Sequence, residues 1–466
     1  MKPQRQFRYH RFLPLAVVMV MFVFLGFGCR GGQKVVESLP QITLNYWTVW
    51  DEPDAFSQII QEYQQIHPNV QISVRKVSFD NYDQTLLEAW ARDEGPDIYS
   101  IPNMAVGTYK EFISPMPATL KLPSLKVSGS GCSKNISLMD ETKATLSPDQ
   151  LDQIFIPTIA SDVVFENNIY GLPLATDTLA LFYNKDLLNT AKVIAPPQTW
   201  QALVDMVDTT KTGLTKEDKG SIIQSGIAIG TSKTVNRAGD VLAALMLQSG
   251  AQMTDATGKA VTFHNASPRE PDFNPGISAL NFYTAFANPS RVTYSWNDTL
   301  GDAQEAFASG KVAFFLGYSY QRDIIARQNP LLHFGVTSLP QINSEGPEVN
   351  VANYWVETVS KKTQYADQAW DFLLSATSDP HVRSYLEKTK KPTALKKILP
   401  EQQADLTLGV FANQLLVAKN WYHGYDYRVM EQAMLQLIDD VNAGKTGSDS
   451  IGLAAQRIQQ TYTKPQ

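Results

Sequence analysis

Asp177 is the single acidic residue in the predominantly apolar segment 172–182. A turn containing Asn168, Gly171 and Pro173 precedes this segment. A carboxylate in such surroundings loses much of its hydration and therefore needs a partner. The sequence leaves two roles open for Asp177, because it can contact a ligand or hold a hinge or turn as a structural acid.

Aromatic and acidic residues also gather where a strand is predicted to end. Trp47, Trp50, Asp51 and Glu52 follow the alternating apolar residues of segment 42–46. A sugar ring packs its C–H face on flat aromatic side chains, and its hydroxyl groups donate to carboxylates and amides. This combination therefore indicates carbohydrate binding.

Other predicted strand ends carry similar groups, at 99–103, 176–177, 318–320 and 354–355. Open α/β sheets bind ligands beyond the carboxyl ends of their strands, so these segments are expected to face one cleft. The candidate ligand-binding residues are Trp47, Trp50, Asp51, Glu52, Asn103, Asp177, Tyr318, Tyr320, Trp355 and Trp421. Trp47 is equally suited to packing between sheets, and Trp355 to packing at an interface.

The elements that must position these residues alternate along the first hundred residues. Segments 42–46, 70–74 and 98–101 have the apolar patterns of strands, and 56–66 and 82–90 have helical spacing, with Asp54 as the predicted cap of the first helix. This order predicts an α/β domain with parallel strand pairing.

Strands and helices are also predicted in the second half of the chain. We expect strands at 227–229, 312–316 and 334–340, and helices at 240–248, after Pro275 and at 303–309. About 425 residues are too many for one core, so two domains are expected. Segment 114–148 lacks clear periodicity and is predicted to be a surface insertion without regular structure.

Several motifs, in order, resemble the family 1 extracellular solute-binding proteins, the maltose-binding-protein-like receptors of ABC importers. The resemblance covers residues 41–460 apart from the insertion. Its motifs are Ile42-Thr43-Leu44-Asn45-Tyr46-Trp47-Thr48, His67-Pro68-Asn69-Val70, Gly95-Pro96-Asp97-Ile98, the crossing segment 168–188, Pro196-Pro197-Gln198-Thr199-Trp200, and the helix, Gly310 and strand over 303–316.

This resemblance implies a type II periplasmic-binding-protein-like fold with two lobes. Each lobe would hold a mostly parallel sheet flanked by helices, joined by hinge crossings. Lobe 1 would comprise residues 41–174 with 356–394, and lobe 2 residues 175–355 with 395–460. The resemblance also implies a monomer that binds a mono- or oligosaccharide, with Asp177 at a ligand-contacting position, and delivers it to ABC permease subunits.

The amino terminus has the features of an export signal. Lys2, Arg5, Arg8 and Arg11 precede the uncharged apolar run 12–27. Residues 1–28 are therefore predicted to be a signal peptide, with lipidation at Cys29 and a tether over 29–40. The lipidation motif is imperfect, because Gly26 replaces the usual leucine, and an uncleaved membrane anchor is the alternative. Either outcome places the domain at the extracytoplasmic face of the cell membrane.

Composition argues against several other functions. The formal net charge is −6, and no dense block of basic residues indicates nucleic-acid binding. The six histidines show no metal-ligand spacing, and no cofactor is expected. No serine-hydrolase elbow, zinc-protease motif or phosphate loop occurs, so we expect no enzyme. The alternatives are a surface glycoside-acting enzyme, a receptor for a non-sugar polar solute and an adhesive protein.

Overall fold

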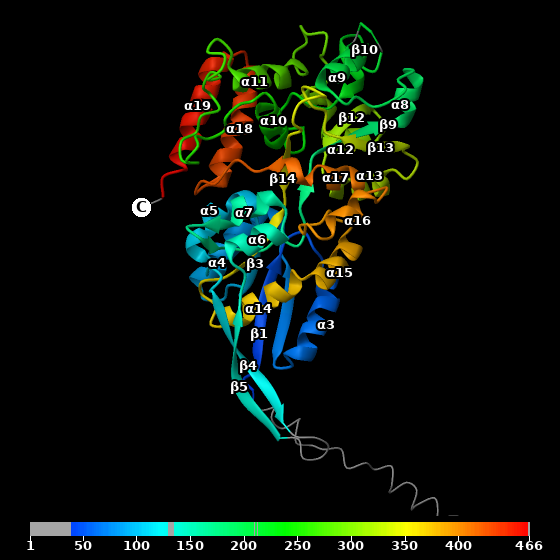
Figure 1. Ribbon diagram of the computed structural model, residues 1–466. Coiled ribbons are helices and arrows are strands. Elements are labelled where there is room, and N and C mark those ends of the chain that lie inside the picture. The colour runs from blue at the N-terminus through cyan, green and yellow to red at the C-terminus, as the bar shows by residue number, and fades with distance from the viewer. Residues whose placement is uncertain (1–38, 129–134, 209, 212, 465–466) are drawn as a thin grey trace, which may run out of the picture.

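The computed structural model describes residues 39–128, 135–208, 210–211 and 213–464. Its elements form two lobes arranged end to end, each built around its own sheet (Figure 1). Helices flank both sheets, so the predicted two-lobed α/β fold is confirmed. The predicted signal peptide and nearly all of the tether lie outside the described residues. Among the described residues, none of the helices has both the length and the apolar character needed to span a lipid bilayer.

The sheet of lobe 1 has the strand order β15-β3-β1-β2. These strands are β1 (Ile42–Thr48), β2 (Val70–Lys76), β3 (Ile98–Pro102) and β15 (Trp355–Val359). β1 pairs in parallel with β2 and β3, whereas β15 runs antiparallel to β3. The carboxyl ends of β1, β2 and β3 therefore meet at one edge, which faces lobe 2 (Figure 1).

Helices cover both faces of this sheet. They are η1 (Pro53–Phe56), α3 (Ser57–Ile66), α4 (Tyr82–Ala91), α5 (Val106–Tyr109), α6 (Pro148–Ile154), α7 (Pro157–Val163), α14 (Ala366–Ala376) and α15 (Asp379–Thr389).

The prediction that Asp54 caps the first helix is wrong. Asp54 lies inside the 3₁₀ turn η1, and its backbone carbonyl accepts the Ser57 hydroxyl instead. Pro53 at the first position of η1 explains why the turn begins one residue earlier.

The sheet of lobe 2 has the order β10-β11-β12-β9-β13. Its strands are β9 (Ala180–Asn184), β10 (Lys216–Asp218), β11 (Ser221–Ile227), β12 (Val312–Gly317) and β13 (Phe334–Ser338). Only β11 and β12 pair in parallel; β9 runs antiparallel to both its neighbours. The prediction of a mostly parallel sheet therefore fails for this lobe, because β9 enters from the crossing segment in the opposite direction.

Helices of lobe 2 pack mainly on this sheet and on each other. They are α8 (Lys185–Thr190), α9 (Trp200–Val207), α10 (Ala238–Gln248), α11 (Pro275–Ala285), α12 (Ala303–Ala308), α13 (Ser319–Gln328), α18 (Tyr427–Asn442) and α19 (Gly447–Gln460). Thr199 caps α9 by accepting from the Ala202 amide, and Gly310 after α12 has a φ of +79°. Both features agree with the motifs predicted from the sequence.

A three-stranded sheet lies between the lobes. It has the order β16-β14-β8 and consists of β8 (Asp177–Thr178), β14 (Asn350–Asn353) and β16 (Ala418–Lys419). Asn353 pairs with Asp177 in antiparallel register. Helix α17 (Gly409–Asn413), which follows α16 (Leu399–Gln403), packs on β8 and β13. The chain therefore crosses between the lobes along adjacent strands, and β8 lies in the crossing segment 168–188 predicted from the sequence.

The insertion is an ordered β-hairpin rather than irregular chain. β4 (Thr119–Ser128) and β5 (Asn135–Ala144) pair antiparallel over their full length. The hairpin projects from the end of lobe 1 remote from lobe 2 (Figure 1). The prediction of irregular structure is wrong because ten cross-strand pairs between two neighbouring segments supply the regularity, and this pairing does not show in the pattern of either segment alone.

Candidate functional site

A row of aromatic rings crosses the carboxyl edge of the lobe 1 sheet. Trp50 follows β1, Phe79 follows β2, and Trp355 begins β15. The ring centroids are 5.2 Å apart for Trp50 and Phe79, 6.2 Å for Trp50 and Trp355, and 6.3 Å for Phe79 and Trp355. The ring of buried Tyr82 packs against Trp355, with the ring centroids 6.1 Å apart. This aromatic row (Trp50, Phe79, Trp355) is therefore one continuous apolar surface.

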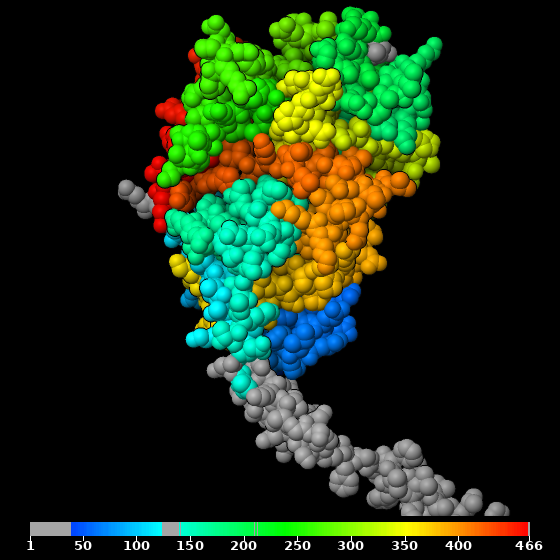
Figure 2. All heavy atoms as spheres, viewed as in Figure 1, coloured from blue at the N-terminus to red at the C-terminus, as the bar shows by residue number. Residues whose placement is uncertain are grey.

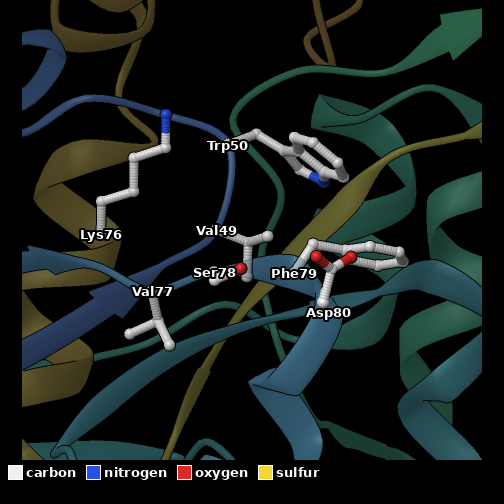
Figure 3. Close-up of a pocket in the computed structure, with 7 residues that line it drawn as sticks. All are labelled: Val49, Trp50, Lys76, Val77, Ser78, Phe79 and Asp80. Carbon is white, nitrogen blue, oxygen red and sulfur yellow. The ribbon is translucent and has the colours of Figure 1, made fainter.

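Two rings of the aromatic row, Trp50 and Phe79, line a pocket of about 550 Å³ together with Val49, Lys76, Val77, Ser78 and Asp80 (Figure 3). Trp50 is 52% exposed and Phe79 50% exposed, which is unusual for rings of this size in a folded domain. Figure 3 shows the two rings on one side of the pocket and Lys76 on the other. Lys76, a lining residue of the pocket, forms an ion pair with Glu52 at 2.6 Å.

Asp51 belongs to a separate polar cluster. Its carboxylate accepts from the Tyr385 hydroxyl at 2.8 Å and from the Lys391 ammonium at 2.5 Å. Lys391 follows α15, so residues far apart in sequence neutralise this acid. Asp51 is thereby fixed as an acceptor beside the strand ends.

Asp177 lies at the amino terminus of α13 in lobe 2. It accepts from the Ser319 amide at 2.9 Å, the Ser319 hydroxyl at 2.6 Å and the Thr178 amide at 2.9 Å. Burial raises the pKa of Asp177 to about 7, although the Ser319 hydroxyl and both amides act against that rise. The helix terminus and these donors hold the carboxyl in one orientation. Asp177 is thus a structural acid that caps α13. The residue is nevertheless partly exposed to solvent.

Tyr318 and Tyr320 stack with their ring centroids 6.4 Å apart and an interplanar angle of 11°. Tyr318 is buried and donates to Asp240 at 2.6 Å, whereas Tyr320 is 48% exposed. Arg237 Nε donates to the same Asp240 oxygen at 2.9 Å, its Nη2 donates to the other oxygen at 3.1 Å, and its Nη1 contacts Glu431. The solvent-exposed ring of Tyr320 therefore stacks on Tyr318, which Asp240 and Arg237 hold in place.

Asn103 belongs to a buried cluster around Asp162, which is fully buried. The Asp162 carboxylate accepts from Tyr354 at 2.5 Å, Asn420 at 3.1 Å and Asn103 at 3.3 Å, and His423 Nε2 lies 3.2 Å away. These groups come from α7, the end of β3, the second crossing and the segment after β16. Asn103 thus helps to join the crossings.

Two candidate tryptophans are mostly enclosed. Trp47 is 7% exposed and lies beneath the guanidinium of Arg75, 4.9 Å from the ring centroid. Trp421 is 8% exposed and packs on Phe263 at 6.0 Å. The structure therefore brings Trp50 and Trp355 together and pairs Tyr318 with Tyr320, but it places these two rings in packing positions.

Sequence reasoning missed Phe79, Asp240, Arg237 and Lys391. Phe79 could have been found, because it follows the end of β2 as Trp50 follows β1. Lys391 carried no such signal, since it meets Asp51 only in the folded chain, whereas Arg237 lies only three residues before Asp240 in the sequence. Within the described part of the chain, no cluster of His, Cys, Asp and Glu is placed to hold a metal ion.

The lobes also touch directly beside the site. Asp83 of α4 accepts from the Tyr427 hydroxyl at 3.0 Å and pairs with Arg428, and both partners belong to α18. Figure 2 shows the orange segment that follows α15 crossing the front of the molecule between the lobes. The aromatic row and the Tyr318–Tyr320 pair therefore come from opposite lobes that meet at the crossings.

Comparison with known proteins places this geometry in a family. The family described as bacterial extracellular solute-binding protein matches residues 58–408. Binding proteins of Brucella abortus (strain 2308) and Brucella suis biovar 1 (strain 1330) are 26% identical over 235 residues, which is 48% of this chain. The chain spans about half of the length of these curated relatives, 50% in each case.

Solved structures share the fold over nearly the whole chain. Maltose-binding protein MalE from Listeria monocytogenes, in complex with maltose, has a TM-score of 0.68 and 17% identity, covering 91% of this chain and 100% of that one. A solute-binding protein of an ABC transporter from Thermotoga lettingae TMO, bound with α-D-tagatose, has a TM-score of 0.66 and 18% identity, with coverages of 90% and 100%. Since the family pattern spans most of the sequence and the architecture agrees, this chain belongs to the bacterial extracellular solute-binding protein family.

Proposed function

We propose that this protein is an extracytoplasmic receptor, tethered to the membrane through Cys29, that captures a carbohydrate between its lobes and delivers it to an ABC permease. The observation that carries the proposal is the aromatic row Trp50, Phe79 and Trp355. Exposed rings match the C–H face of a sugar, and the fixed carboxylates match its hydroxyl groups.

Similarity supports the same ligand class. The solved relatives from Listeria monocytogenes and Thermotoga lettingae carry maltose and tagatose. In this chain, Asp177 and Tyr320 of lobe 2 would contact the ligand from the side opposite to the aromatic row. A ligand that touches both lobes favours the closed form, because only that form makes both sets of contacts. The receptor would act as a monomer without chemistry on the ligand. The lobe limits at 174/175, 355/356 and 394/395 belong to this proposal.

A thermal-shift screen tests the ligand class. Sugars, polyols, amino acids and short peptides are added to the purified protein, and the unfolding temperature is recorded. A ligand present at 100 times its dissociation constant adds about 2.7 kcal/mol to the free energy of unfolding. We expect hits among mono- or oligosaccharides. Stabilisation by amino acids or peptides alone would contradict the carbohydrate assignment, and hydrolysis of chromogenic glycosides would favour an enzyme.

Removal of Trp50 tests the site itself. Trp50→Ala should weaken binding of the sugar found in the screen about tenfold, because a stacked ring is lost from a partly desolvated contact. Isothermal titration calorimetry measures the affinity. Phe273→Ala is the matched control, since Phe273 is also a partly exposed ring, in the loop before α11. Equal affinities of the Trp50 variant and the original protein would remove the aromatic row from the site.

A further inference from the structure

Arg237 has an unusual backbone conformation at the start of α10. Its φ is +57°, in the left-handed region, which is strained for a residue with a side chain. A glycine would adopt this conformation without the strain. Strained residues persist where the surrounding contacts hold them, and they gather at functional sites. The contacts of the Arg237 side chain therefore indicate what the strained conformation supports.

The guanidinium of Arg237 fixes the carboxylate of Asp240. Nε and Nη2 donate to its two oxygens at 2.9 and 3.1 Å, respectively. The oxygen that meets Nε also accepts from the Tyr318 hydroxyl at 2.6 Å and from the Asn353 amide at 3.4 Å. Two bonds from one planar guanidinium restrict the rotation of a carboxylate. Tyr318 and Asn353 therefore meet an acceptor of fixed orientation. These four residues are called the Asp240 cluster.

A second series of hydrogen bonds joins the same two segments of lobe 2. The Asn236 side chain accepts from the backbone N–H of Gln304 at 3.1 Å, and the Gln321 side chain donates to that of Gln304 at 2.9 Å. Gln321 in turn accepts from the backbone N–H of Tyr318 at 2.9 Å. Since Asn236 directly precedes Arg237, the start of α13 is held at two points, by the backbone and by the hydroxyl of Tyr318.

Tyr320 lies in this first turn of α13. Its ring stacks on that of Tyr318 with an interplanar angle of 11°, and the residue is 48% exposed. Tyr318 is buried, so its ring gives Tyr320 a fixed neighbour. An exposed ring binds the C–H face of a sugar more tightly when its orientation is set before the ligand arrives. The Asp240 cluster thus lies directly behind a ring that the proposed function places against the ligand.

Stability of lobe 2 alone is a weaker explanation of the Asp240 cluster. Both charges of a partly buried ion pair lose hydration, and apolar side chains in place of such a pair are often neutral or stabilising. The Arg237 side chain is only 30% exposed, and it also contacts Glu431 of α18 at 3.4 Å. Arg237 therefore combines backbone strain with desolvation, a combination that favours a role in holding the site.

We propose that Arg237 is a positioning residue of the sugar site, which sets the orientation of Tyr320 through Asp240 and Tyr318. This inference rests on the proposed function, because the ligand that Tyr320 would contact is the carbohydrate of that proposal. Arg237 raises the affinity without contact with the ligand, since an oriented ring loses less conformational freedom on binding. Loss of Arg237 should therefore matter only while Tyr320 is present.

A double-mutant cycle tests this dependence. Isothermal titration calorimetry gives the affinity of each variant for the sugar found in the screen. We expect Arg237→Gln to weaken binding about fivefold and Tyr320→Ala about tenfold, and the double variant should also lose only about tenfold. A loss of about fiftyfold in the double variant would overturn the role, because Arg237 would then act independently of Tyr320.

Arg327→Gln is the matched control, because Arg327 is an exposed arginine in the last turn of the same helix, α13. This variant should bind the sugar with unchanged affinity. Unfolding temperatures check that all variants are folded in the assay. If Arg237→Gln is unfolded, Arg237→Lys takes its place in the cycle, since lysine keeps the charge but cannot make the two parallel hydrogen bonds.

Fluorine NMR follows the ring of Tyr320 without any ligand. The chain is labelled with 3-fluorotyrosine, and the signal that disappears in Tyr320→Phe belongs to residue 320. In Arg237→Gln this signal should shift and broaden, because the ring is no longer held in one orientation, and in Arg327→Gln it should stay the same. An unchanged signal in Arg237→Gln would overturn the positioning role, since a purely stabilising residue leaves the ring in place.

The outcomes separate this inference from the proposed function. A sugar that binds equally well to Tyr320→Ala and to the original protein would overturn the inference alone, because the aromatic row would still hold the ligand. Failure of every sugar to bind the original protein would overturn the receptor function, and the role of Arg237 in affinity with it.

Discussion

Replacement of Asp162 by alanine is expected to lower the free energy of unfolding by about 3–5 kcal/mol. The carboxylate is fully buried and accepts from Tyr354, Asn103 and Asn420, with His423 Nε2 at 3.2 Å. Alanine would leave the buried Tyr354 hydroxyl without this acceptor, and Asn103 and Asn420 would keep only their backbone acceptors at Ala352 and Tyr422. The lost hydrogen bonds lie in a region of low dielectric constant, where the desolvation cost is greatest. Urea unfolding followed by tryptophan fluorescence measures the loss.

Asp152→Ala is the matched control, because Asp152 is an exposed acid on the neighbouring helix α6. It should change the free energy of unfolding by less than about 0.5 kcal/mol. Asp162→Asn should lie between the two variants, since it keeps an acceptor oxygen but loses the charge. A loss below about 1 kcal/mol for Asp162→Ala would show that water replaces the carboxylate and that the cluster does not hold the crossings together.

Glu357 is expected to make the protein less stable as the pH rises. This residue of β15 is 4% exposed, and burial raises its pKa from 4.5 to about 7, against the effect of the Ser100 hydroxyl at 2.5 Å. Asp51 adds to the rise and Lys391 opposes it. Because the folded state holds the proton more tightly than the unfolded state, stability is highest at low pH and falls until the pH exceeds about 7.

Between pH 5.5 and 8, ionisation of Glu357 should lower the free energy of unfolding by about 2 kcal/mol. Glu357→Gln, which cannot ionise, should remove that part of the pH dependence and be more stable than the original protein at pH 8. Unfolding temperatures measured across this range show the change. Glu345→Gln, at an exposed position, should leave the pH dependence intact. Parallel pH profiles for Glu357→Gln and the original protein would contradict the assignment.

Asp177 should also lower the stability as the pH rises, because its pKa is likewise raised to about 7. The Glu357→Gln variant should therefore retain a weaker pH dependence. Both acids lie on segments that cross between the lobes or begin just beyond a crossing. The expected stability of the crossings thus depends on protonation at near-neutral pH.

Local pattern was sufficient to predict most elements of this protein. The alternation in 42–46 predicted β1, Thr199 and Trp200 predicted the start of α9, and Gly310 predicted the boundary between α12 and β12. These features depend on neighbouring residues, because side-chain periodicity, caps and glycine turns act over a few positions. The aromatic residues after β1 could be located by the same means.

The partners of the polar groups were decided only by the tertiary structure. Asp177 meets Ser319, and Asp51 meets Lys391, across more than a hundred residues of sequence. The ten pairs of the β4–β5 hairpin and the antiparallel direction of β9 likewise depend on strand pairing. A sequence shows which residues need a partner, because burial of a charge is costly. The packing of the whole chain decides which residue becomes that partner.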